Sequence, residues 1–377
     1  MRVFIQSIVA QLLLNPYILW RGYHALPPKR IFRMPFVLLI ALEFLLYMTG
    51  FIFRNVMPDG PLITIQYICN TWYIASIYIT LSLLALELIK LSNRLFPWFP
   101  RCITNRWQQV KLTLFGIIAI GVTCLMIHAY NRVANPITRH IYIDIPKSGG
   151  DRDSLKIVMM SDLHIGEVIG KELVRKYVEM CNKERPDMVV MTGDIMDYES
   201  RFAEKAHIEE DLQQIKAPLG LYFIYGNHEY RANRHAKERW LRSTGGILLL
   251  DSVAMPDSSF YLIGRDDFIN KRRKPLQAMM RELDRDKPTI VLDHQPWSFA
   301  EMAMNRVDLG LHGHTHNGQL WPYPLLMKLV YESPYGYYRK GETQFYTSSG
   351  IGIAGPPYRV GTVSEMVVLH INFTGRQ

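Results

Sequence analysis

Five short polar segments in the second half of the chain carry side chains that can bind metal ions or transfer protons. Residues two apart in an extended segment point the same way, so Asp162 with His164, and His314 with His316, can each act together. One such segment alone would be an ordinary turn, but five in order predict a functional site. The segments are Ser161–His164, Thr192–Asp194, Gly226–Glu229, Asp293–Pro296 and His312–His316.

Together these segments offer oxygen and nitrogen ligands without a thiolate. Such a set favours Zn, Mn or Fe in a two-metal site and suits calcium poorly. Cys181 is the only cysteine after residue 144, which excludes a disulfide framework or a four-thiolate zinc site there. The candidate side chains are Asp162, Asp194, Asp293, Asn227, His164, His228, His294, His312, His314 and His316.

Each polar segment follows a short apolar run that is typical of a buried strand. Because ligands in α/β sheets bind beyond the carboxyl ends of strands, we expect the segments to meet at one crevice. An amphipathic stretch, Lys171–Lys183, predicts a helix that crosses between the first two strands. The expected strands are Leu155–Met160, Met188–Met191, Leu221–Tyr225, Thr289–Leu292 and Leu309–Leu311.

The order Asp-x-His, Gly-Asp, Gly-Asn-His-Glu, His, Gly-His-x-His resembles the calcineurin-like metallophosphoesterase superfamily over about residues 155–318. Residues 313–319, with Gly350–Gly352 and Arg359–Gly361, resemble its membrane-anchored branch. That branch includes transmembrane proteins with a metallophosphoesterase domain and bacterial phosphodiesterases of the UDP-2,3-diacylglucosamine type. The resemblance implies an α/β four-layer (α-β-β-α) sandwich and a hydrolase that cleaves a phosphodiester or pyrophosphate bond.

The resemblance also assigns roles to single residues. Two divalent metal ions (Mn, Zn or Fe) are implied as cofactors, and a hydroxide bridging them would attack the phosphorus. His228 would protonate the leaving oxygen. Arg359 has two interpretations, a bidentate donor to substrate phosphate or a structural salt bridge, for example with Glu365. The implied ligands are Asp162, His164 and His316 for one ion, Asn227, His294 and His314 for the other, and Asp194 between them.

The first part of the chain is apolar enough to form a membrane bundle. Met34–Phe53, Ile63–Ile89 and Leu112–Tyr130 approach the length of a membrane-spanning helix. A fourth stretch, Val3–Trp20, is interrupted by polar residues; it spans, lies in the interface, or is a signal peptide, although no cleavage site follows. We expect a membrane domain of three to four helices over residues 1–130, a linker over 131–144 and the catalytic domain over 145–377.

The net charge of +9 resides in residues 1–144, which carry 13 Lys and Arg against 4 Asp and Glu, whereas residues 145–377 carry 30 of each. No nucleic-acid partner is therefore expected. The connecting segments 21–33 and 90–111 are basic, which predicts an integral membrane protein with these segments in the cytoplasm and an extracytoplasmic catalytic domain. Lipid-headgroup contact is the alternative reading of these charges. The predicted side conflicts with a UDP-diacylglucosamine substrate, which is cytoplasmic.

Three functions remain open. The first is a membrane-anchored phosphodiesterase or pyrophosphatase acting on a lipid or headgroup phosphate, with the bilayer as a partner. The second is a phosphomonoesterase or nucleotidase whose anchor only fixes its location. The third is a non-catalytic membrane sensor. The aromatic stretch Trp321–Tyr338 is interpreted either as a cap that dips toward the bilayer or as ordinary packing beneath the sheet.

Overall fold

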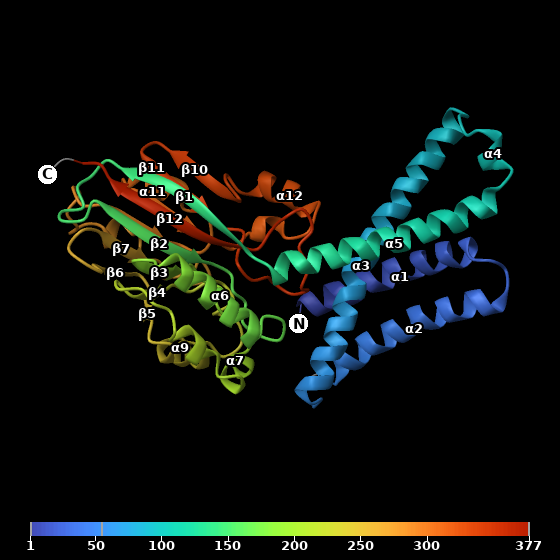
Figure 1. Ribbon diagram of the computed structural model, residues 1–377, viewed down its shortest axis with the longest axis horizontal. Coiled ribbons are helices and arrows are strands. Elements are labelled where there is room, and N and C mark those ends of the chain that lie inside the picture. The colour runs from blue at the N-terminus through green and yellow to red at the C-terminus, as the bar shows by residue number, and fades with distance from the viewer. Residues whose placement is uncertain (1, 54–55, 376–377) are drawn as a thin grey trace. The chain divides into compact units, whose positions relative to one another are not determined.

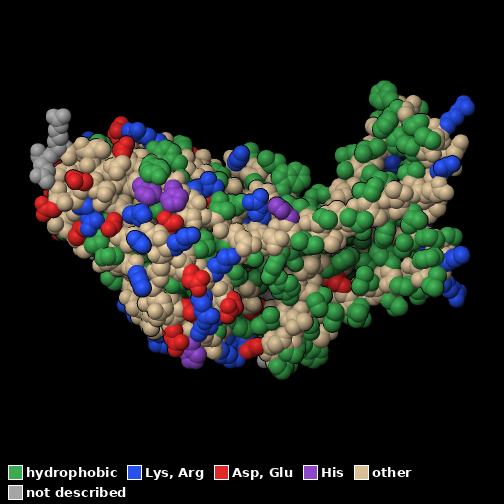
Figure 2. Space-filling model, viewed as in Figure 1, with side chains coloured by type: hydrophobic (Ala, Val, Ile, Leu, Met, Phe, Trp, Pro, Cys, Tyr) green, Lys and Arg blue, Asp and Glu red, His purple; other side chains and the backbone are tan. Residues whose placement is uncertain are grey.

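The computed structural model describes residues 2–53 and 56–375, which divide into two compact units, 1–129 and 130–377. The N-terminal unit is helical (Figure 1). Three of its helices, α2, α3 and α5, are long and apolar enough to cross a membrane, and hydrophobic side chains cover their surfaces (Figure 2). The helices are α1 (Arg2–Ala25), α2 (Arg30–Ile52), α3 (Asp59–Leu95), α4 (Arg101–Thr104) and α5 (Trp107–Ala134).

Buried polar side chains join the first three helices. Asn15 of α1 donates to the carboxylate of Glu43 in α2 at 3.3 Å and accepts from the indole of Trp72 in α3 at 2.9 Å. A polar group in hydrocarbon is stable when it is hydrogen-bonded inside the bundle. Through these bonds Glu43 links α2 to α1, and Asn15 extends the contact to α3.

The C-terminal unit contains two six-stranded mixed sheets (Figure 1). The first has the order β1-β12-β2-β3-β4-β5 and the second the order β10-β11-β9-β8-β7-β6. The first sheet comprises β1 (Ile137–Ile145), β2 (Ser154–Met160), β3 (Met188–Met191), β4 (Leu221–Phe223), β5 (Ile247–Leu248) and β12 (Glu365–Phe373). The second comprises β6 (Ser252–Ala254), β7 (Tyr261–Gly264), β8 (Thr289–Leu292), β9 (Leu309–His312), β10 (Gly336–Lys340) and β11 (Thr343–Thr347).

Strand alternation assigns the buried side chains to separate layers. In β2, Ile157 and Met159 point into the core between the two sheets, whereas Val158 points to the outer face and packs with the helices there. Helices α6 (Lys171–Glu184), α7 (Arg201–Lys205), α8 (Ile208–Leu212) and α9 (Arg234–Ser243) contribute to that outer core. Helices α10 (Leu276–Met279) and α11 (Phe299–Met304) contribute to a third core against the second sheet. The predicted four-layer sandwich is confirmed.

The expected linker over residues 131–144 is wrong in the structure. Its first residues belong to α5, and most of the rest form β1, which pairs in parallel with β12 from Ile137 opposite Glu365 to Ile145 opposite Phe373. Ile143 and Ile145 are buried by this pairing. Polar residues such as His140 and Asp144 hide the strand in the sequence, because they occupy the exposed face of an edge strand.

Candidate metal centre

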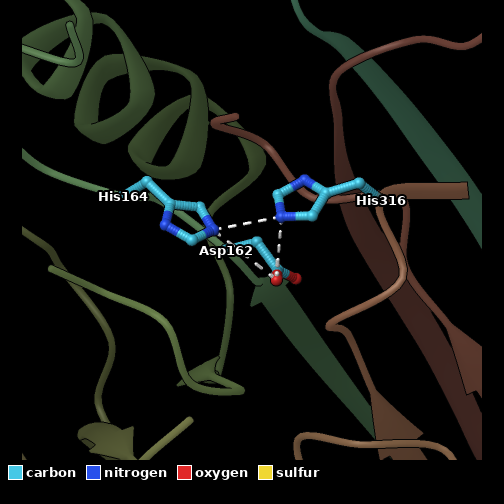
Figure 3. A group of neighbouring side chains, drawn as sticks. All are labelled: Asp162, His164 and His316. Atoms are coloured by element: carbon cyan, nitrogen blue, oxygen red, sulfur yellow. Dashed lines mark hydrogen bonds and ion pairs between the residues drawn. The ribbon is translucent and has the colours of Figure 1, made fainter. Parts of the chain in front are cut away.

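The five polar segments meet where their strands end, and their ligand atoms converge. Three groups of side chains each place their ligand atoms within 4.8 Å of one another, and Asp194 belongs to two of the groups. The first group is drawn in Figure 3, where His164 and His316 point toward the Asp162 carboxylate. The groups are Asp162, His164 and His316; His164, Asp194 and His228; and Asp194, His294 and His314.

In the first group, the Nε2 atoms of His164 and His316 lie 3.0 Å apart, and His316 Nε2 is 3.4 Å from Asp162 Oδ1. In the third group, Asp194 Oδ2 lies 3.2 Å from His294 Nε2. His164 Nε2 is also 3.8 Å from Asp194 Oδ2, so Asp194 reaches both ends of the site. This is the arrangement that a carboxylate shared by two ions requires.

Most of the predicted ligands have an unusual backbone conformation. Five of the seven predicted ligands have positive φ, which is costly for residues other than glycine and persists where the surrounding structure enforces it. Gly193 and Gly226 make the required close approach possible, because a Cβ atom on Gly193 would lie 2.7 Å from His294 Nδ1, and one on Gly226 2.8 Å from His294 Cδ2. The five strained ligands are Asp162, His164, Asp194, His314 and His316.

Glu229 organises the loops that carry Asp194 and Asn227, a role the sequence analysis missed. Its fully buried carboxylate accepts hydrogen bonds from four backbone N–H groups at 2.8–3.0 Å. These donors belong to Asp194, Ile195, Met196 and Gly226. The sequence places Glu229 directly after Asn227 and His228. It does not show that a loop more than thirty residues away donates hydrogen bonds to the Glu229 carboxylate.

His228 is oriented by Asp197, which the sequence analysis also missed. The Nδ1 atom of His228 lies 2.9 Å from the Asp197 carboxylate and 3.0 Å from the Asp197 carbonyl oxygen. Its Nε2 atom lies 4.0 Å from Asp194 Oδ2 and therefore faces the ligands. Fully buried Lys237 donates to the carbonyl oxygen of His228 at 2.6 Å and fixes the same loop. The available signal was an acid three residues after Asp194, because a catalytic histidine commonly needs an orienting carboxylate.

Burial and neighbouring charges shift the pKa values of three residues in the site away from their ordinary values. Burial would raise the pKa of Asp194, but the neighbouring His294 and His228 outweigh burial and hold this pKa well below its ordinary value. Burial would lower the pKa of His294, but Asp194 outweighs it and raises this pKa well above the ordinary value. Burial lowers the pKa of His314 to about 3, so the imidazole of His314 is neutral at physiological pH.

The donor set fits divalent metal ions. Asn227 Oδ1 is buried and has no hydrogen-bond partner among the described residues, and His294 Nε2 also lacks one apart from its ion pair with Asp194. Unpaired buried polar atoms are rare and need a reason. Carboxylate oxygens and imidazole nitrogens that face each other without intervening donors are suited to an ion of the Mn, Zn or Fe type.

Two candidates from the sequence are not part of this site. The Asp293 carboxylate is bound by both terminal nitrogens of Arg273 at 3.1 Å and by Ser298 at 2.7 Å. The Nδ1 atom of His312 lies 2.6 Å from the carbonyl oxygen of Asp293, and the His312 ring packs on Phe299. Both residues support the loop that carries His294, so they act in the fold and not as ligands.

Arg359 does not face a substrate in the structure. It is fully buried, and its terminal nitrogens donate to the carbonyl oxygens of His316, Ser349 and Gly352 at 2.5–3.1 Å. The alternative salt bridge with Glu365 is also absent, because Glu365 pairs with Arg139 at 2.7 Å. Arg359 thus ties the loop of His316 to the loop that follows β11.

The comparisons with known proteins agree with this geometry. A sequence model of calcineurin-like phosphoesterases matches residues 155–318. The chain is 29% identical over 320 residues to an uncharacterized metallophosphoesterase of Campylobacter jejuni, covering 81% of this chain and 83% of that protein. It is 30% identical over 229 residues to an uncharacterized metallophosphoesterase of Aquifex aeolicus, covering 59% and 86%. It is 29% identical over 389 residues to a transmembrane protein with metallophosphoesterase domain of Danio rerio, covering 96% and 87%.

Proposed function

The chain belongs to the calcineurin-like phosphoesterase family, and from this premise we propose that it is a membrane-anchored, two-metal hydrolase of phosphodiester or pyrophosphate bonds. The observation that supports the proposal most strongly is the convergence of six of the seven predicted ligands in three overlapping groups, two of which contain Asp194. Asp162, His164 and His316 would hold one ion. Asn227, His294 and His314 would hold the other.

When bound, the ions supply a water molecule of lowered pKa and neutralise the charge of the phosphoryl oxygens. The chain supplies the proton for the leaving oxygen. With Nδ1 of His228 held by Asp197, the Nε2 atom points toward the ligands and can carry that proton. Burial would raise the pKa of Asp197, but hydrogen bonds from His164 and His228 outweigh burial and lower this pKa, so Asp197 stays ionised and fixes the orientation of His228.

The substrate class is proposed to be a lipid or lipid headgroup phosphate, and the domain is proposed to lie on the extracytoplasmic side. Three membrane-spanning candidates and similarity to a transmembrane relative over 96% of the chain support a substrate at the bilayer. The orientation is supported by the two basic segments. They lie at one end of the N-terminal unit, since Lys111 donates to the carbonyl oxygen of His24 at 3.1 Å.

The test is hydrolysis by the detergent-solubilised full chain, stripped of metal and then supplied with Mn, Zn or Fe. Bis-p-nitrophenyl phosphate and p-nitrophenyl phosphate are compared under each condition. We expect metal-restored turnover that favours the diester and is lost in Asp194→Ala. A preference for the monoester would replace the proposal with a phosphomonoesterase, and metal binding without turnover of either ester would replace it with a sensor.

A further inference from the structure

Helix α12 (Tyr323–Val330) is an apolar helix without a buried residue. Its side chains Leu325, Leu326 and Val330 are about half exposed, and Leu329 is 83% exposed. Lys328 is its single charged residue. A contiguous apolar surface on a folded domain marks an interaction site.

Both ends of α12 are fixed to the metal centre. At its start, the helix follows the turn η1 (His316–Gly318), and a Cβ atom on Gly318 would lie 2.5 Å from the backbone nitrogen of Pro324. At its end, Tyr331 packs on Trp297 with 4.2 Å between ring centroids, and its ring lies 6.3 Å from that of His314. The aromatic rings of Tyr331 and Trp297 thus lie between the exposed helix and a predicted metal ligand, His314.

The short covalent connection of the domain to a membrane-spanning candidate favours the bilayer as the partner of α12. The membrane-spanning candidate α5 ends at Ala134, and β1 begins at Ile137, so only two residues separate this helix from the catalytic sheet. This short connection keeps the start of the catalytic sheet close to the end of α5. Tyr, Leu and Val with a single Lys are suited to the boundary between headgroups and acyl chains.

We propose that α12 is an interfacial helix that inserts Leu325, Leu326, Leu329 and Val330 into the bilayer. It thereby lets a phosphoester carried on a lipid reach the metal centre along Tyr331 and Trp297. The membrane docking stands on the exposure of α12 and the short tether. The entry route rests in addition on the proposed function.

The docking is tested on the full chain in phosphatidylcholine–phosphatidylglycerol vesicles. The exposed native thiols are removed by Cys102→Ser and Cys124→Ser, and a nitrobenzoxadiazole label is attached through Leu329→Cys. The control label is attached through Glu172→Cys, a polar position on α6 whose side chain is 89% exposed. Lipids with a nitroxide on the acyl chain are the quencher, and they act from both leaflets.

We expect the label at 329 to be blue-shifted and quenched several-fold more than the label at 172. Equal quenching at the two positions would overturn the docking. A blue shift at 329 without quenching would also overturn it, because the helix would then be covered by protein and not by lipid.

The entry route is tested by the ratio of two activities, on the vesicle-borne p-nitrophenyl ester of dioleoyl phosphatidic acid and on soluble bis-p-nitrophenyl phosphate. Leu326→Ser with Leu329→Ser should lower this ratio about tenfold. Met304→Ser, which changes a 78% exposed side chain on α11, should leave the ratio at its wild-type value. An unchanged ratio in the double variant would overturn the route. Absence of turnover in the wild type would overturn the proposed function, while the quenching would still decide the docking.

Discussion

The close pair of Asp194 and His294 should couple metal binding to the release of a proton. The Asp194 carboxylate raises the pKa of His294 well above its ordinary value, which favours the protonated imidazole in the metal-free site. A histidine ligand binds metal in its neutral form. Metal binding should therefore release protons, and the apparent affinity should rise as the pH rises toward the pKa of His294.

Calorimetric titration of Mn or Zn in buffers of different ionisation enthalpy measures this release directly. We expect the observed heat to depend on the buffer at pH 7. His314 contributes nothing to this release, because its pKa of about 3 leaves it neutral already. A heat that is identical in all buffers would show that the site binds metal without losing a proton.

His228 should matter most for poor leaving groups. Loss of a general acid lowers kcat by about 100- to 10,000-fold when the leaving oxygen needs a proton. We expect His228→Gln to show this loss with an alkyl ester and a much smaller loss with a p-nitrophenyl ester, whose leaving group is stable as an anion. Asp197→Asn should likewise lower kcat more with the alkyl ester than with the p-nitrophenyl ester. The metal content of both variants should equal that of the wild type. Equal losses with both esters would contradict the assignment.

At the scale of elements, the sequence predicts the strands that are buried on both faces. Residues Met188–Met191 and Thr289–Leu292 are expected and observed with identical bounds, because every side chain in them is buried. Edge strands lack such a continuous apolar run and are therefore harder to predict. In β1, polar residues alternate with apolar ones, and its partner β12 lies more than 200 residues away.

The candidate site shows a similar difference. Local motifs predict some of its residues, whereas the roles of others depend on contacts that are distant in the sequence. The seven predicted ligands could be named from the sequence because each follows a strand within a recognisable motif. Glu229 and Asp197 were missed because their roles depend on contacts with loops from other strands. Neither interpretation of Arg359, a phosphate donor or a salt bridge with Glu365, predicts its observed contacts, because packing buries this side chain against backbone carbonyl oxygens.

The pairing of β1 with β12 predicts where the catalytic domain can be cut. A fragment that begins at residue 135 keeps β1, whereas one that begins at 146 loses it and exposes the edge of β12. Burial of Ile143 and Ile145 is worth about 3–6 kcal/mol together. We expect the shorter fragment to melt roughly 10 °C lower and to aggregate. Scanning calorimetry and gel filtration provide the comparison, and equal stability would show that β1 is dispensable.

At the scale of the whole molecule, the charge asymmetry predicts which side of the membrane each part occupies. Lys and Arg side chains gather at one end of the N-terminal unit (Figure 2). Positively charged loops are retained in the cytoplasm. Cys102 lies in one of these segments, and its side chain is exposed. Glu172 lies in the catalytic domain.

A membrane-impermeant maleimide distinguishes the two sides in intact cells. We expect Glu172→Cys to be labelled without permeabilisation and the native Cys102 to be labelled only after it. The opposite pattern would place the catalytic domain in the cytoplasm. Such a result would reverse the proposed orientation and would remove the conflict with a cytoplasmic nucleotide-sugar substrate.

We propose that two metal ions sharing Asp194 make this chain a phosphoester hydrolase. The most direct measurement is the hydrolysis rate of bis-p-nitrophenyl phosphate by the metal-free full chain, followed as Mn is added in known equivalents. We predict no turnover without metal, a rise that saturates at about two equivalents per chain, and no rise in Asp194→Ala. Turnover by the metal-free chain, or full metal binding that never produces turnover, would contradict the account.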